Sequence, residues 1–511
     1  MTETKIIRGR WVITGGAEDH PVLSDGAVAV EGDSIAAVGA WADLRQRYPD
    51  AAVIGSADTA VMPGLINAHH HSSGVSSLQQ GVSDLLLEAW LLALRRGRPT
   101  DVYLNTLLSS ARLLRTGVTS VVDVHSGRDT ANGYADGVRR ALRAYDESGM
   151  RVAFAAGFST QSLIVAGAGE DETFLAGLPA DARRYAEHML PKPGDMTEDE
   201  YFAIMDEYWQ AHRAHPRIDL WFAPPGPQWV SDAFMQRSAE QAATYDAGLQ
   251  THVTESIYEK LHGPRFYGKP TMLHMHDLGV LSPRFSIAHG VWLTDAEIEI
   301  MAETGAAVSH NPSSNLRLRA GIAPLNALLA AGTTTALGMD GTTLNDDEDM
   351  FTEMRLAMRL HRTPLLATPA PEPRQVFEVA TAGGAKLLGK ENRLGRLKAG
   401  YAADLVVLDL DHITWPWVAP ECDGRDLILM RARASDVDTV LVNGEVVLKD
   451  GKPTRFDAAA AGREMAERLA REAYPQEGAD LAEVLWPHIE AYYLGWELPA
   501  FTPYIQYNSS R

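Results

Sequence analysis

Eight short apolar runs alternate with segments of helical periodicity through the middle of this chain, and this alternation constrains the fold most strongly. The runs are 64–71, 119–126, 151–157, 218–224, 248–256, 285–292, 306–312 and 334–341. Helices are predicted between them at 100–114, 133–148, 198–212, 232–246 and 294–304. Strands that alternate with helices indicate a parallel sheet covered by helices. Because no Gly-rich phosphate loop opens any helix, eight such units favour a closed α/β barrel, the (β/α)8 fold, over an open doubly wound sheet.

The two ends of the chain have a different pattern. Residues 5–62 and 395–450 contain short strand-like runs separated by turns, with Asn443-Gly444 as a strong hairpin signal. We expect the two ends to pair into one small β-sandwich domain. The predicted organisation is 1–62 for the first part of the sandwich, 63–394 for the barrel, 395–456 for the second part and 457–511 for a C-terminal helix and tail. Residues 158–197 are expected to be an insertion after the third barrel strand.

Composition and missing motifs exclude several classes of function. The net charge of −21 repels phosphate backbones and anionic membrane surfaces, so neither nucleic acid nor a membrane is an expected partner. A single cysteine, Cys422, favours a reducing compartment, and the cytoplasm is predicted. We find no signal peptide and no apolar stretch long enough to span a membrane. The motifs of zincin proteases, P-loop nucleotide hydrolases and serine hydrolases are also missing.

Histidines and an aspartate end several of the predicted strands. Alternate side chains of a strand share a face, so His69 and His71 point to the same side and His70 points to the other. His252 and Asp340 end the fifth and eighth runs. The carboxyl ends of barrel strands meet on one face, where active sites are built. The sequence therefore predicts a metal site formed by His69, His71, His252 and Asp340.

Two further residues are candidates for catalysis. Glu255 would face away from the site if the strand stayed extended, but a turn at the strand end would bring it into the barrel mouth, where we expect it to act as general acid/base. His289 ends the sixth run and is expected to orient or polarise the attacking water, with a buried core histidine as the alternative. The fourth run, IDLWFAP, has no lysine to bridge two ions. We therefore expect one divalent metal per chain, with zinc as the first expectation and iron as the alternative.

Five long segments resemble the cytosine-deaminase and triazine-hydrolase branch of the amidohydrolase superfamily. They are PGLINAHHH (63–71), THVTES (251–256), IAHGVWLTDAEI (287–298), SHNPSSNLRLRAGIAP (309–324) and LGMDGTTLNDDEDMFTEMR (337–355), in the order of the family and across nearly the whole chain. The resemblance implies the same four metal ligands, proton transfer by Glu255 and assistance from His289. It also implies that Asp340 acts as a base toward water, that the substrate is a small molecule, and that the chain forms a homo-oligomer, either a dimer or a tetramer.

The residues expected to contact substrate depart from that pattern in two places. Nucleoside deaminases of this branch have Ala-Pro-His after the fourth strand, whereas Ala223-Pro224 is followed here by Pro225. Gln80-Gly81 stands where those relatives have Arg-Gly. An adenosine-like substrate is therefore not favoured. Candidate pocket residues, each of which has an ordinary packing or turn role as its alternative, are Trp90, His125, Gln228, Trp229, Trp292, Asn311 and Ser314.

The predicted function is metal-dependent hydrolysis of a non-peptide carbon–nitrogen bond, first of all deamination of an amino-substituted N-heterocycle. Amides, ureas and carbamates are the alternative substrates, because they too pass through a tetrahedral carbon that a cation stabilises. A non-catalytic metal-binding barrel is the alternative from another class. The presence of Glu255 argues against it.

Overall fold

The computed structural model describes residues 4–17, 19–126, 130–167, 169–362, 366 and 370–497. Eight parallel strands lie in chain order in one sheet. They are β6 (Leu65–His70), β7 (Val118–Ser126), β8 (Arg151–Gly157), β9 (Ile218–Phe222), β10 (Leu249–Val253), β11 (Phe285–His289), β12 (Ala307–His310) and β13 (Thr334–Leu337). The backbone N–H of Asp340, just after β13, donates to the carbonyl oxygen of His69 in β6 at 2.9 Å. The last strand thus meets the first, and the predicted (β/α)8 barrel is confirmed.

Helices cover the outside of the barrel. They are α3 (Val102–Arg115), α4 (Ala131–Ser148), α7 (Glu198–His212), α8 (Asp232–Tyr245), α10 (Thr271–Asp277), α11 (Asp295–Thr304), α13 (Leu325–Ala330), α14 (Met350–Leu360), α15 (Pro373–Glu378) and α16 (Gly384–Leu387). The five helices predicted from sequence are present, each with ends within two residues of the expected ones. Thr294 and Glu297 form the capping box that starts α11.

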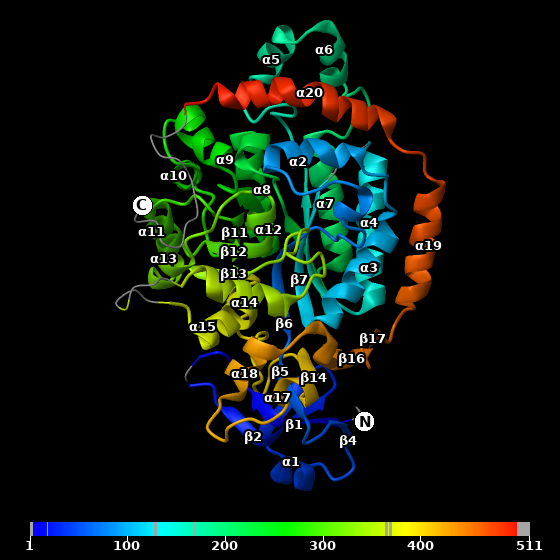
Figure 1. The fold of residues 1–511 in the computed structure, drawn as a ribbon, viewed down its shortest axis with the longest axis vertical. Coiled ribbons are helices and arrows are strands. Elements are labelled where there is room, and N and C mark those ends of the chain that lie inside the picture. Colours follow the sequence, from blue (N-terminus) through cyan, green and yellow to red (C-terminus); the bar gives the residue numbers. More distant parts are fainter. Residues whose placement is uncertain are drawn as a thin grey trace.

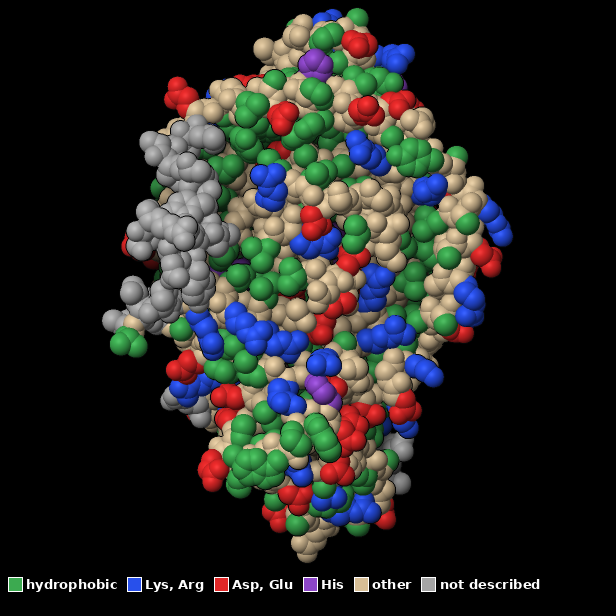
Figure 2. Space-filling view, viewed as in Figure 1, with side chains coloured by type: hydrophobic (Ala, Val, Ile, Leu, Met, Phe, Trp, Pro, Cys, Tyr) green, Lys and Arg blue, Asp and Glu red, His purple; other side chains and the backbone are tan. Residues whose placement is uncertain are grey.

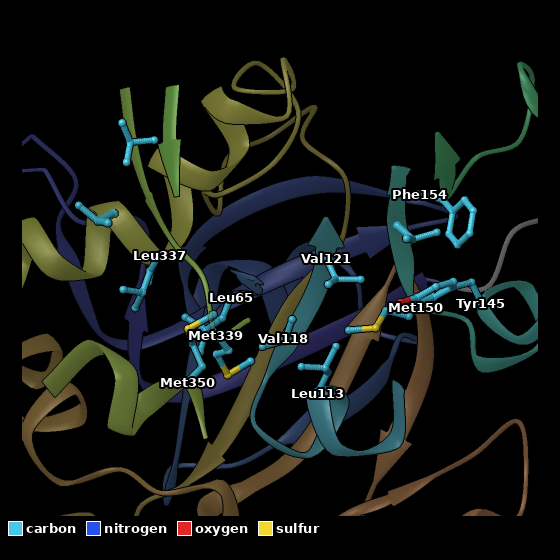
Figure 3. Packing of buried hydrophobic residues seen from close by; sticks show 14 of the residues in the cluster. Leu65, Leu113, Val118, Val121, Tyr145, Met150, Phe154, Leu337, Met339 and Met350 are labelled. Atoms are coloured by element: carbon cyan, nitrogen blue, oxygen red, sulfur yellow. The ribbon is translucent and has the colours of Figure 1, made fainter. Parts of the chain in front are cut away.

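The main hydrophobic core lies between the strands and these helices. Leu65, Val118 and Val121 of the strands pack in one cluster with Leu113 of α3 and Met350 of α14 (Figure 3). All five are fully buried. Burial of such a side chain contributes about 1.5–3 kcal/mol, so this layer holds the strands, and with them the strand ends, in fixed positions.

The two ends of the chain form a second sheet below the barrel (Figure 1). The N-terminal end supplies β1 (Thr4–Ile13), β2 (Val22–Glu31), β3 (Ser34–Ala40), β4 (Ala52–Gly55) and β5 (Thr59–Pro63). The C-terminal part supplies β14 (Leu405–Asp409), β15 (Val437–Val442), β16 (Glu445–Lys449) and β17 (Lys452–Pro453). Antiparallel pairing of β5 with β14 joins the two parts, as expected. The short helices α1 (Trp41–Arg47), α17 (Asp411–Thr414) and α18 (Gly424–Arg431) lie in the same part of the chain.

Further helices cover the end of the barrel that lies away from the second sheet. This layer consists of α2 (Leu87–Ala93), the 3-10 turn η2 (Leu94–Arg96), residues 163–167 and 169–190 with α5 (Asp171–Gly177) and α6 (Ala180–Glu187), and α20 (Gln476–Leu494). We call these segments the cap. They share a hydrophobic cluster of their own, and Figure 1 shows α20 crossing the barrel end between α2 and the α5–α6 pair.

The C-terminal region differs in one respect from the expected single helix and tail. It contains two helices, α19 (Ala458–Arg471) along the side of the barrel and α20 across its end. The expected tail beyond residue 497 lies outside the described residues.

On the face drawn in Figure 2, acidic and basic side chains are interspersed. No helix in the described part of the chain has the length and apolar character needed to cross a membrane.

A buried ion pair fastens the barrel to the second sheet. Arg151, the first residue of β8, donates to both carboxylate oxygens of Asp404 at 2.8 and 3.1 Å. The backbone N–H of Asn443 donates to the same carboxylate at 2.7 Å. Both charged side chains are about 4% exposed. Because each charge has its partner inside the protein, removal of one would leave the other buried and uncompensated.

We therefore predict that Asp404→Ala lowers the free energy of unfolding by about 3–5 kcal/mol, measured by chemical denaturation. Asp199→Ala is the matched control, because it breaks an Arg–Asp pair with Arg237 that lies at the surface. That control should cost less than about 1 kcal/mol. Equal effects of the two substitutions would contradict the role of the Arg151–Asp404 pair.

Candidate metal and catalytic site

Five side chains from four strand ends converge inside the barrel mouth. His69, His71 and His252 offer ligand atoms within 4.8 Å of one another, and His69, His289 and Asp340 form an overlapping group of the same kind. The Nε2 atom of His71 lies 3.2 Å from Oδ1 of Asp340, and that of His69 lies 3.6 Å from the same oxygen. The four residues predicted as metal ligands are thus brought together at the carboxyl ends of β6, β10 and β13.

Hydrogen bonds to backbone oxygens fix the tautomers of two of these rings. His71 donates from Nδ1 to the carbonyl oxygen of Val124 at 2.9 Å, and His252 donates from Nδ1 to that of Pro225 at 2.6 Å. In a neutral imidazole the other nitrogen then carries a lone pair. The two Nε2 atoms face each other at 3.3 Å. Two lone pairs at this distance repel unless a cation lies between them, so the arrangement fits a metal ion.

Gln250 orients the third ring. Its amide nitrogen donates to the carbonyl oxygen of Ala68 at 2.9 Å, so its Oε1 is the atom that accepts from Nδ1 of His69 at 2.8 Å. The Nε2 atom of His69 is fully buried and has no hydrogen-bond partner among the described residues. A histidine ligand is typically held in this way through its second nitrogen.

The electrostatics of the site favour neutral imidazoles beside an ionised carboxylate. Burial lowers the pKa of His252 to about 3, and it also lowers that of His69 well below its ordinary value. Burial alone would raise the pKa of Asp340, but the adjacent His71 and His69 rings outweigh burial and lower it. Neutral imidazoles and a carboxylate are the ligand forms that a divalent metal requires.

Left-handed backbone conformations cluster at these strand ends. The φ angles are 74° at His289, 54° at Asp340, 51° at Thr254 and 50° at Ser72. Residues other than glycine adopt this region at a cost of about 1–3 kcal/mol, and such strain concentrates at functional sites. At Thr254 the consequence is visible, because the turn directs Glu255 into the barrel mouth instead of leaving it on the outer face.

Glu255 lies buried beside His289. Its Oε2 is 3.4 Å from Nε2 of His289, and its Oε1 has no partner in the described part of the chain. Burial raises the pKa of the Glu255 carboxyl well above its ordinary value, and the nearby Glu259 and Asp340 carboxylates add to this. A buried carboxyl group with a raised pKa is suited to carry a proton between reacting groups.

Two acidic residues at the site were missed by the sequence analysis. Oε2 of Glu259 accepts from the backbone N–H of Glu255 at 2.7 Å, and Oε1 accepts from the amide of Gln228 at 2.9 Å. Oε1 of Glu88 accepts from the hydroxyl of Ser256, while Oε2 is buried without a partner among the described residues. Ser256 caps α9 (Ile257–His262), so Ser256 and Glu259 have the spacing of a capping box, and the sequence gives no sign that this carboxylate turns toward Glu255.

The short helix α12 (Pro312–Arg317) holds two of the site residues in place. Ser314 donates from Oγ to Oδ2 of Asp340 at 2.5 Å, which leaves Oδ1 of Asp340 facing the histidines. Asn315 accepts from Nδ1 of His289 at 2.9 Å. Asn311 lies beside the same ring, with 3.3 Å between its Nδ2 and Nδ1 of His289. Asn311 and Ser314 were expected to shape the pocket, but neither lines it.

A cavity of about 640 Å³ opens over these groups. Its inner end is lined by His71, His252, Glu255, His289 and Asp340. The cavity also has Glu88, Trp90, Gln228, Trp229 and Glu259 in its walls. Its size lies within the range of about 300–1,000 Å³ that is typical of small-molecule sites.

Besides Asn311 and Ser314, two further expected pocket residues do not line this cavity. His125 packs against the rings of Tyr134 and Phe154. Trp292 donates from its indole nitrogen to the carbonyl oxygen of Ala320 at 2.9 Å. Both residues lie close to a strand end in the sequence, but the orientation of their side chains comes from helix packing and loop conformation, which the strand pattern does not specify.

His70 points away from the other histidines, as the alternation of the strand requires. Its Nδ1 accepts from the backbone N–H of Ser72 at 2.9 Å, and its Nε2 lies 3.6 Å from Glu348. The ring is fully buried. It therefore belongs to the packing beneath the site and is not a member of either candidate ligand group.

The chain matches a known family over most of its length. The model of the amidohydrolase family matches residues 60–447. Among curated relatives, the 5-methylthioadenosine/S-adenosylhomocysteine deaminase of Nitratidesulfovibrio vulgaris (strain Miyazaki F) is 31% identical over 90% of this chain and 96% of its own length. The 5'-deoxyadenosine deaminase of Methanosarcina barkeri is 31% identical over 88% of this chain and 94% of its own.

Solved structures give the same result. An adenosine deaminase from Xanthomonas campestris with bound zinc has a TM-score of 0.76, 29% sequence identity and coverage of 91% of this chain and 98% of its own. The atrazine chlorohydrolase of Arthrobacter aurescens TC1 with zinc has a TM-score of 0.75, 24% identity and coverage of 91% and 99%. At 24% identity, the similarity to the chlorohydrolase shows a common fold. The zinc-bound deaminase and the His/Asp cluster together support a divalent metal in this protein.

A buried carboxyl behind α12 leads to a prediction about pH. Burial raises the pKa of Glu353 to about 8, although the hydroxyl and the N–H of Ser313 both donate to it. The unfolded chain binds its proton only below the ordinary value near 4.5. Between these two values the folded protein binds more protons than the unfolded chain, so stability falls as pH rises.

We therefore expect Glu353→Gln to reduce the fall in unfolding temperature between about pH 5 and pH 8, because the amide cannot lose a proton and still accepts from Ser313. The measurement is thermal unfolding across this pH range. Glu299→Gln, at an exposed position of α11, serves as the control and should behave like the unsubstituted protein. An identical pH dependence of Glu353→Gln and the unsubstituted protein would contradict the prediction.

Proposed function

Because this chain belongs to the amidohydrolase family, and is therefore a hydrolytic enzyme, we propose that it deaminates an amino-substituted N-heterocycle by hydrolysis. The observation that carries the proposal is the position of Glu255, a buried carboxyl with a raised pKa that lies in the cavity beside the histidine and aspartate cluster. A proton carrier is needed in this reaction, because the amino group must leave as ammonia.

We assign the metal to His69, His71, His252 and Asp340, with one zinc ion per chain in preference to iron. Three fixed imidazole lone pairs and an ionised carboxylate match the ligand chemistry of zinc. Strand β9 has no lysine that would bridge a second ion. A bound zinc ion lowers the pKa of a coordinated water to about 7 and stabilises negative charge on oxygen.

The side chains around the cation have distinct tasks in this proposal. Water adds through its oxygen to the carbon that bears the amino group, and Glu255 takes the proton that this oxygen loses. Glu255 then gives this proton to the amino nitrogen, and the second proton of the water, which Asp340 accepts, passes to the ring nitrogen. The bond between the carbon and the amino nitrogen breaks, and ammonia leaves as the carbon becomes a carbonyl. His289, held by Asn315, faces Glu255 and the cavity. Ser314 orients Asp340, which also accepts a proton from water.

The first candidate for the heterocycle is a 6-aminopurine. The two relatives act on adenosine derivatives according to their names, and the chain covers more than nine-tenths of the length of each. The amide of Gln228 and the oxygen of Glu88 that has no partner among the described residues offer this substrate polar contacts in the cavity. Pro225 and Gln80, at positions where nucleoside deaminases have histidine and arginine, line the cavity too, so we expect the contacts of the substrate there to differ from those in nucleoside deaminases.

The remaining assignments complete the proposal. The single cysteine, Cys422, favours a reducing compartment, and we propose the cytoplasm. We also propose a homo-oligomer with an even number of subunits, on the general preference of soluble oligomers for closed symmetry.

The assignment of ligands predicts different effects for neighbouring histidines. His69→Ala should remove most of the bound zinc, because it deletes a ligand whose Nδ1 is already held by Gln250. His70→Ala should leave the zinc content near that of the unsubstituted protein, because this ring points away from the cluster. Metal analysis of purified protein measures both. Equal loss of zinc from the two variants would show that His70 is a ligand or that His69 is not.

The reaction itself is tested with zinc-loaded protein and a panel of amino-heterocycles, amides, ureas and carbamates. We expect ammonia from a heterocycle, and we expect Glu255→Gln to lower kcat/KM on the order of 10²- to 10⁴-fold with zinc content unchanged. Glu490→Gln, at an exposed position of α20, is the control. Amine release from an acyclic amide, urea or carbamate would replace the proposed substrate class, and full activity of Glu255→Gln would remove Glu255 from the mechanism.

A further inference from the structure

The substrate cavity extends from the catalytic groups to the cap. Its outer wall is apolar and comes from three segments that are far apart in the sequence. Leu87 and Leu92 belong to α2, Ile164, Val165 and Met189 to the insertion after β8, and Ile489 to α20. Leu92, Ile164, Val165, Met189 and Ile489 are also members of the hydrophobic cluster of the cap. The wall is therefore continuous with a packed core and is not a set of isolated side chains.

The position of α20 over the cavity is fixed by several contacts. Tyr493 lines the cavity, and its hydroxyl oxygen accepts from the backbone N–H of Ala166 at 3.1 Å. Tyr492 donates to the carboxylate of Glu170. At the other end of the helix, Gly478 lies so close to η2 that a Cβ there would collide with the carbonyl oxygen of Arg95. These contacts hold Ile489 at a defined place in the wall.

Few basic side chains around the cavity could pair with an anionic group. Glu88, Glu255, Glu259 and Asp340 line the cavity, and among the described lining residues Arg95 is the one that carries a basic side chain of the Lys or Arg type. A carboxylate or phosphate on the substrate would therefore find one side chain of that type in the described cavity wall, at the η2 turn. The unlike ends of the cavity, acidic at the metal site and apolar at the cap, match a molecule with a polar head and an uncharged apolar tail.

We propose that the cap wall is a subsite for an apolar, uncharged substituent of the substrate, and that Ile489 of α20 is a residue that determines specificity there. The inference rests on the proposed function for the identity of the head, an amino-heterocycle at the metal end. It adds that the full substrate carries an alkyl, alkylthio or aryl group that reaches α2, the insertion and α20. Water leaves this apolar surface when the tail binds, so affinity rises with the apolar area of the tail.

The test measures binding apart from turnover. Zinc-loaded Glu255→Gln protein is titrated with 9-alkyladenines and with 5'-alkylthio-5'-deoxyadenosines of increasing chain length, from methyl to butyl, by calorimetry. Each added methylene should strengthen binding about fourfold, which is the gain for a fully buried methylene group. Equal dissociation constants along both series would overturn the proposal.

Two substitutions from separate segments then locate the subsite. Ile489→Trp and Met189→Trp, made in the same protein, fill the outer cavity from α20 and from the insertion, so either remains informative if the other fails to fold. Each should abolish the gain from longer tails and leave the affinity for the methyl compounds within about twofold. Glu490→Trp is the matched control, because it introduces the same side chain at the next, exposed position of α20. A chain-length dependence that survives in both cavity variants would overturn the subsite.

Ammonia release by the protein with Glu255 intact separates this inference from the proposed function. If ammonia is released but affinity does not change with tail length, the deaminase assignment holds and the subsite is wrong. If affinity rises with tail length but no compound yields ammonia, the subsite holds and the reaction is wrong.

Discussion

The site depends on hydrogen bonds that leave three histidine nitrogens without a proton. Val124, Pro225 and Gln250 each accept from an Nδ1 atom, so the Nε2 lone pairs converge on one point beside Asp340. Two of the three acceptors are backbone carbonyls, whose positions are set by the barrel itself. Repulsion among the lone pairs is tolerated because the core between strands and helices holds the strand ends rigidly, and a cation relieves that repulsion.

The sequence predicted those parts of the site that follow from the periodicity of strands. His69 and His71 on one side, His70 on the other, and His252, His289 and Asp340 at strand ends are consequences of the two-residue repeat and of the parallel order. The barrel, the pairing of the two chain ends and the five helices were predictable for the same reason. Each depends on a local pattern of apolar residues.

The parts that the sequence did not predict depend on loops and on distant contacts. A turn that brings Glu255 into the mouth was one of the two expectations for this strand end, but the sequence did not indicate that Glu259 accepts from the backbone N–H of Glu255, because the spacing of Glu259 from Ser256 resembles an ordinary helix cap. His125 and Trp292 were expected to line the pocket because of their residue types. Instead His125 packs against Phe154, and Trp292 donates to the carbonyl oxygen of Ala320. Nothing in a local pattern indicates that α20 would meet the insertion more than 300 residues earlier, as it does through Tyr493 and Ala166.

The sheet at the base of the barrel has a consequence for how this protein is made. Strand β5, which ends at Pro63, pairs with β14, which begins at Leu405, so its partner is synthesised more than 300 residues later. Until then one edge of β5 has free backbone donors and acceptors, a form in which strands readily join other chains. The nascent chain thus carries an exposed edge for most of its time on the ribosome, and the final closure of the sheet belongs to the last stage of folding.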